Sequence, residues 1–120
     1  RDETLTVRGA GETLDFTYVD DTAEGIVLAS LNSSANGNCY NITRSSPTTY
    51  TLLDAAELCV KLTGQGTIDV VDRDLSFPSR GRLSIERASQ DFNYKPTVDL
   101  DEGLKRYYEW YLQHSVLWRR

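Results

Sequence analysis

Short runs of apolar residues predict four strands in the first two thirds of the chain. Apolar and polar side chains alternate in TLTVR at residues 4–8 and in DFTYV at residues 15–19, as in strands with one buried face. CYNIT at residues 39–43 is typical of a strand that is buried on both faces and therefore needs parallel neighbours. TIDVV at residues 67–71 is the fourth run. The glycines at residues 9–11 favour a turn between the first two runs.

Apolar residues recur at intervals of three and four in the other segments, which predicts helices. We expect four helices, at residues 21–31, 52–62 and 85–92 and from residue 99 onward. Residues that favour helix ends stand at their boundaries. The expected capping boxes pair Asp21 with Glu24, Thr51 with Asp54 and Asp99 with Glu102; Ser84 caps the third helix and Gly64 closes the second.

The order of these elements is typical of an α/β fold: strand, strand–helix, strand–helix, strand, helix, helix. A chain of 120 residues suits a single domain, and a hydrophobic fraction of 39% is enough for a modest core. The strands are few and short, however, and the sequence does not supply the neighbours that residues 39–43 would need. We therefore expect a sheet that is incomplete on its own.

Composition narrows the possible functions. A formal net charge of −5 argues against the basic surface that non-specific nucleic-acid binding requires. No apolar stretch reaches the ~18 residues of a membrane-spanning helix. No residue spacing resembles a metal site, and the single histidine, His114, is expected on a solvated helix face rather than in a catalytic arrangement. Arginines cluster nonetheless at positions 73, 80, 82 and 87, which allows a local anion site.

Four segments in this order carry a family resemblance. They are GETLDFTYVDDTAEGIVLA at residues 11–29, GNCYNIT at 37–43, LLDAAELCVKLTG at 52–64 and RGRLSIERASQDFNYKPTVDLDEGLKRYYEWY at 80–111. Together they resemble the C-terminal part of the extended short-chain dehydrogenase/reductases, the NAD-dependent sugar-nucleotide epimerase/dehydratase family. Because the match covers nearly the whole chain, the resemblance implies that residues 1–120 form the substrate-binding segment of a Rossmann-type enzyme.

The resemblance also implies what this chain lacks. Family members carry a glycine-rich NAD-binding loop and a Tyr-x-x-x-Lys catalytic pair in an N-terminal half, and neither motif is present here. GAGETL at residues 9–14 lacks the third glycine and the strand–turn–helix setting of a phosphate loop. We therefore expect no catalytic, cofactor-binding or metal-binding residue in this chain. The chain should bind no NAD alone, whereas the complete enzyme would use NAD.

The candidate substrate-binding residues are Arg80, Arg82 and Arg73. The family commonly has an arginine near the substrate diphosphate just before the DF pair, and Leu14 stands there in this chain. Arg80, in FPSRGR, lies where related members place a phosphate-facing arginine. A guanidinium can donate two parallel hydrogen bonds to phosphate oxygens, which suits the diphosphate of a sugar nucleotide. Arg82 and Arg73 are the weaker candidates, and a solvated loop arginine is the alternative interpretation for each.

Two functions remain open. The first is the substrate-side segment of a cytoplasmic NAD-dependent epimerase or dehydratase, holding the nucleotide-diphosphate end of its substrate. The second is a non-catalytic, stand-alone module of the same fold that binds a protein partner or a nucleotide. In the first case the expected partners are a nucleotide sugar and either the missing N-terminal Rossmann half or a second copy of the chain. No nucleic-acid or membrane partner is expected.

Overall fold

A computed structural model of the chain describes residues 3–115. Its elements are β1 (Thr4–Arg8), β2 (Thr13–Leu14), α1 (Val19–Leu31), the short 3₁₀ helix η1 (Ser33–Ala35), β3 (Tyr50–Thr51), α2 (Leu52–Thr63), β4 (Thr67–Val71), α3 (Glu86–Phe92) and α4 (Leu100–His114). Four α-helices and a few short strands confirm the predicted α/β class within this range. No helix among these residues is long and apolar enough to cross a membrane.

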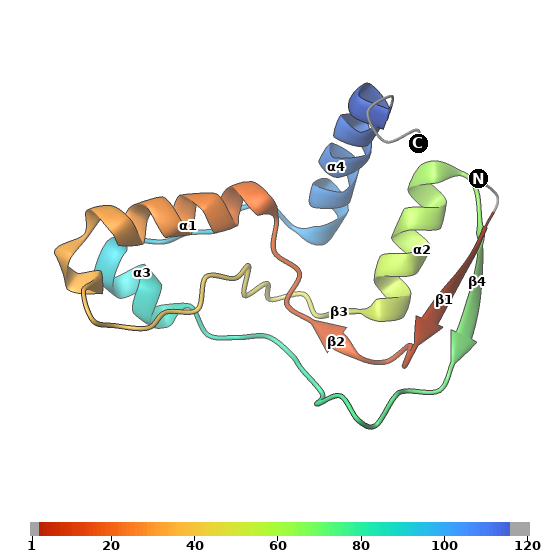
Figure 1. Cartoon of the computed structure of the whole chain (residues 1–120), viewed down its shortest axis with the longest axis horizontal. Helices are drawn as coiled ribbons and strands as arrows, with labels where there is room; N and C mark the ends of the chain where they lie inside the picture. Colours follow the sequence, from red (N-terminus) through yellow and green to blue (C-terminus); the bar gives the residue numbers. More distant parts are fainter. Residues whose placement is uncertain (1–2, 116–120) are drawn as a thin grey trace.

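The strands form two separate two-stranded sheets. β1 pairs with β4 in parallel, in a register that places Val7 opposite Val70, and β2 pairs with β3 antiparallel. Figure 1 shows α2 beside the β1–β4 pair and α1 next to α3 at the other end of the molecule. Parallel strands normally lie inside larger, doubly covered sheets, so a lone parallel pair is an incomplete sheet, as predicted.

Helix α2 forms as its sequence predicts. The Thr51 side chain accepts a hydrogen bond from the Asp54 amide, and the Asp54 carboxylate accepts one from the Thr51 amide, which completes the capping box. Gly64 ends the helix in the left-handed region, at φ +67°, where a residue without a Cβ is favoured. These interactions are local in sequence, so no distant segment is needed to produce them.

Two predicted strands are absent. Residues 15–18 and 39–43 have no partner strand and are irregular. A strand exists only if another strand pairs with its backbone, and the apolar pattern does not supply one. In residues 39–43 the apolar side chains instead pack on the core beside α3, where the Tyr40 ring meets Phe92 edge-on at 4.8 Å between centroids.

The predicted capping box of the first helix is wrong. Helix α1 begins at Val19 with Tyr18 as its N-cap, which places Asp21 in the first turn. Asp21 is buried, and its two carboxylate oxygens accept hydrogen bonds from the amides of Thr97 and Val98 at 3.0 and 2.9 Å. The carboxylate thus compensates backbone donors of a distant segment, an interaction that the local pattern could not reveal.

The predicted N-terminal caps of α3 and α4 are correct only in part. Asp99 is the N-cap residue of α4, but its side chain makes no capping bond, and Glu102 pairs with Arg106 at 2.8 Å instead. Helix α3 begins at Glu86, one residue later than predicted, with the Glu86 amide donating to Ser84 Oγ at 3.3 Å. For Glu102, the ion pair with Arg106 thus replaces the expected capping bond.

A small core forms where α1, α3 and the segment after α3 meet. Ala88, Phe92 and the completely buried Tyr94 lie at its centre. Burial raises the pKa of Tyr94 to about 12, so its hydroxyl stays protonated and donates to the Thr43 carbonyl at 3.2 Å. Helix α1 approaches this core closely at Gly25, where a Cβ would collide with Ile42 and lie 2.9 Å from the Tyr94 ring.

Candidate functional site

A cleft of about 650 Å³ lies between the segment that follows β2 and the loop at residues 79–83. Arg80 and Arg82 both line it from exposed positions. Thr43 lines the same cleft, and its Oγ1 is buried with no hydrogen-bond partner among the described residues. Two arginines thus line one open space, an arrangement that suits a phosphate or carboxylate group.

Arg73 lies on the other side of Arg80, in an adjoining cleft of about 390 Å³. Its Nε lies 3.1 Å from Glu12 Oε1, and its second guanidinium nitrogen donates to the Phe77 carbonyl at 2.8 Å. The charge of Arg73 is therefore already paired within the protein. Among the three predicted arginines, the structure brings Arg80 and Arg82 to one cleft and holds Arg73 in the wall of its neighbour.

Leu14, which replaces the arginine expected from the resemblance, lines both of these clefts. It belongs to β2, opposite Tyr50 of β3. Leucine offers no hydrogen-bond donor, so a ligand in either cleft would meet an apolar surface at this position. In the larger cleft, a charge-assisted contact to an anion would come from Arg80 and Arg82, and in the smaller cleft Arg8 of β1 also lines the wall.

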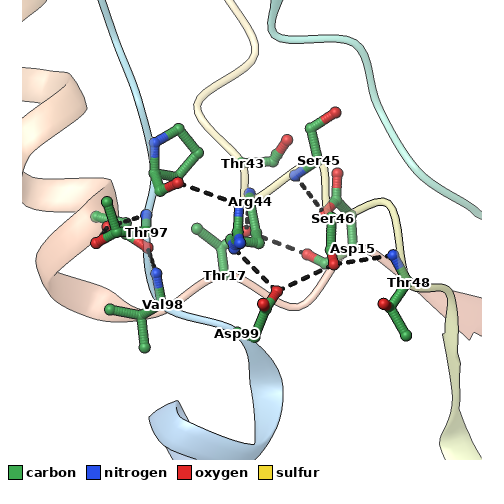
Figure 2. Close-up of polar contacts among 12 residues, drawn as sticks. Asp15, Thr17, Thr43, Arg44, Ser45, Ser46, Thr48, Thr97, Val98 and Asp99 are labelled. Atoms are coloured by element: carbon green, nitrogen blue, oxygen red, sulfur yellow. Dashed lines mark hydrogen bonds and ion pairs between the residues drawn. The ribbon is translucent and has the colours of Figure 1, made fainter.

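Sequence reasoning missed Arg44, which lies at the centre of a polar network (Figure 2). Arg44 and Arg82 both line a third cleft. The Arg44 Nε lies 3.1 Å from Asp99 Oδ1 and forms an ion pair with it, but the two groups are not aligned for a hydrogen bond. A terminal guanidinium nitrogen of Arg44 donates a hydrogen bond to the Pro96 carbonyl at 3.1 Å. The Arg44 amide donates to Thr17 Oγ1. In the sequence, Arg44 belongs to the polar run at residues 44–49. That run predicts a loop, but it does not indicate that Arg44 contacts Asp99, Pro96 or Thr17.

Tyr50 lines this third cleft as well. Burial, followed by the nearby carboxylates of Asp101 and Asp99, raises the pKa of the Tyr50 phenol. Its hydroxyl therefore stays protonated at neutral pH. The third cleft has a volume of only about 10 Å³, which leaves room for no more than a water molecule.

The described residues do not form a dinucleotide site around the N-terminal glycines. Gly9 adopts φ +72° in a turn that leads into β2, whereas pyrophosphate binding uses the N-terminus of a helix after such a turn. His114 lies on α4, where its ring stacks on Trp110 at 4.8 Å between centroids. No group of three or more His, Cys, Asp or Glu side chains within residues 3–115 could hold a metal ion.

No family model matches the chain, but curated proteins do. The chain is 31% identical over 119 residues to UDP-glucuronate 4-epimerase 1 of Arabidopsis thaliana, a match that covers 83% of this chain and 26% of the relative. It is 32% identical over 119 residues to UDP-glucuronic acid decarboxylase 1 of Xenopus tropicalis, covering 95% and 27%. The chain therefore spans about a quarter of the length of the curated relatives that it matches.

Solved structures give the same relationship. UDP-glucuronic acid 4-epimerase from Bacillus cereus, in complex with UDP-glucuronic acid and NAD, superposes with a TM-score of 0.77 at 32% identity, covering 93% of this chain and 36% of that one. The epimerase Mth375 from Methanothermobacter thermautotrophicus gives a TM-score of 0.87 at 26% identity, covering 97% and 35%. This agreement accounts for an open sheet, since the matched region is only about a third of each larger fold.

Proposed function

Because the chain is homologous to part of the NAD-dependent sugar-nucleotide epimerases and dehydratases, we propose that it is the C-terminal, substrate-side segment of such an enzyme. Its role would be to hold the nucleotide-diphosphate end of the substrate. NAD and the catalytic tyrosine and lysine would belong to an N-terminal half outside residues 1–120. Binding the remote end of the substrate orients the sugar for a reaction that other residues carry out.

The observation that carries this proposal is the shared cleft of Arg80 and Arg82. A diphosphate carries two neighbouring charged groups, and two guanidinium groups on one open cleft can each donate to one of them. Arg73 would have a supporting role, since its ion pair with Glu12 already satisfies its charge.

Substitution of Arg80 tests the assignment in the full-length protein. We expect Arg80→Ala to raise the dissociation constant for UDP-glucuronate by about one to two orders of magnitude, because a hydrogen bond to a charged group is worth roughly 1.5–3 kcal/mol. The melting temperature should barely change, since exposed arginines contribute little to stability. Titration calorimetry and thermal unfolding measure the two quantities.

Arg87→Ala is the matched control. Arg87 lies on α3, where its guanidinium donates hydrogen bonds to Asn38 and to the Cys39 carbonyl and lies 5.0 Å from the centre of the Tyr40 ring. It does not line the cleft that Arg80 and Arg82 share. Its removal should lower stability and leave ligand affinity unchanged, the reverse of the Arg80 result. If Arg80→Ala binds UDP-glucuronate as tightly as the parent does, the site assignment is wrong.

The exposed apolar surface supports a further part of this proposal, that a Rossmann half docks against this segment. Large apolar side chains of α1 and α4 lie open, among them Leu31 at 81% exposure and Tyr107 at 59%. Apolar surface of this extent and open strand edges usually meet another chain or domain. Alone, the chain should self-associate in light scattering, whereas a folded monomer at high concentration would contradict the docking proposal.

A further inference from the structure

The side chains of Thr13 and Asp15 hold the loop at residues 79–83, which carries Arg80 and Arg82 and is called the arginine loop. Thr13 Oγ1 donates to the main-chain carbonyl of Arg80 at 3.0 Å. The main-chain amide of Leu83 donates to Asp15 Oδ2 at 3.0 Å. These bonds fix the backbone on either side of Arg82, so both arginine side chains start from anchored main chain.

Asp15 is itself fixed to the body of the molecule. Its other oxygen, Oδ1, accepts a hydrogen bond from the Ser45 amide at 2.9 Å (Figure 2). The segment around Ser45 is in turn tied down through Arg44, whose guanidinium contacts Asp99 and the Pro96 carbonyl. The Asp15 carboxylate therefore links the arginine loop to the segment at residues 44–45, which Arg44 attaches to Asp99 and Pro96.

Glu12 extends the same attachment toward the start of the loop. Its Oε2 accepts a hydrogen bond from Ser79 Oγ at 2.9 Å, and its Oε1 forms the ion pair with Arg73. By contrast, residues 74–80 have no regular secondary structure and every one of them is exposed. Burial cannot order such a loop, and an unanchored loop loses conformational entropy when a ligand fixes it.

We infer that Thr13 and Asp15 are positioning residues that preorganise the arginine loop for an anionic ligand. Held in one conformation, the loop presents Arg80 and Arg82 to the cleft before the ligand arrives, so binding does not have to order it. The effect on ligand affinity rests on the proposed function. The effect on the order of the loop does not, and it can be measured without any ligand.

Amide hydrogen exchange on the 120-residue chain tests the loop itself. We expect Asp15→Ala to speed exchange of the Leu83 amide about tenfold or more, because that amide loses its acceptor. Thr13→Val should speed exchange in residues 79–83 while keeping the shape of the side chain. Asp69→Ala, which removes an exposed carboxylate from β4, is the control for charge and should leave the loop unchanged. If both loop variants fold and exchange these amides like the parent, the inference is overturned.

A double-mutant cycle tests the functional consequence, with UDP as the probe and the full-length protein. Asp15→Ala should weaken UDP binding about tenfold in the parent and by much less in the Arg80→Ala background, because it acts through that arginine. Equal effects in both backgrounds would show that Asp15 supports the fold generally, which would overturn the positioning role. If the parent does not bind UDP, the proposed function fails, and hydrogen exchange still decides whether these residues hold the loop.

Discussion

The two irregular segments on either side of α3 are held in opposite ways. From Phe92, the last residue of the helix, to Val98, every second residue is buried. Before it, residues 74–80 are all exposed, and side chains of the β2 segment hold the loop through hydrogen bonds. Irregular backbone can thus be fixed by burial or by polar anchors. Burial makes the first segment part of the core, whereas polar anchoring leaves the second open to a ligand.

Replacing Phe92, at the end of α3 where the buried segment begins, and Phe77, in the exposed loop, should produce the largest contrast. Phe92→Ala should destabilise the chain by about 3–5 kcal/mol, because it removes a buried ring and leaves a cavity beside Tyr40. Phe77 is 65% exposed, so Phe77→Ala should cost no more than about 0.5 kcal/mol. Urea unfolding followed by circular dichroism measures both. Similar losses for the two variants would refute the distinction between the segments.

Asp21→Ala should produce the next largest effect. It removes the acceptor of two main-chain amides, those of Thr97 and Val98, and leaves them without their partner. We expect a loss of about 2–4 kcal/mol of unfolding free energy, because hydrogen bonds to charged groups are individually strong. Asp20→Ala, at an exposed neighbouring position, is the control and should change little. An equal loss in both variants would show that charge at the helix start matters more than the buried acceptor.

An added arginine at position 14, beside the arginine loop, should produce the smallest effect, a gain in ligand affinity. Leu14→Arg places a donor in the two clefts that Leu14 lines, and we expect UDP to bind about tenfold more tightly, since part of the new bond is lost to side-chain ordering. Leu75→Arg adds the same charge to an exposed loop position outside those clefts. If both variants raise affinity equally, net charge rather than cleft geometry governs binding.

The candidate site could be predicted only in part from the sequence. The resemblance identified Arg80 as a candidate, and the local cluster of arginines added Arg82. The structure brings both to one cleft, although their role in binding stays a prediction. Arg73 was chosen in the same way, but the structure gives it the carboxylate of Glu12 as a partner. Arg44 and Thr43 were missed because their importance depends on neighbours more than 25 positions away in the chain.

By itself, the sequence determined those elements whose stabilising contacts lie within a few residues. Helix α2 with its capping box and Gly64 is the clearest case. The apolar pattern also located strands β1 and β4, but their pairing joins residues that are distant in the sequence. Only the tertiary structure decided that residues 15–18 and 39–43 are not strands and that Asp21 is a buried acceptor for Thr97 and Val98. The physical reason is that strand pairing and burial of a charge both require a partner distant in sequence, whereas a helix cap carries its partner within the same turn.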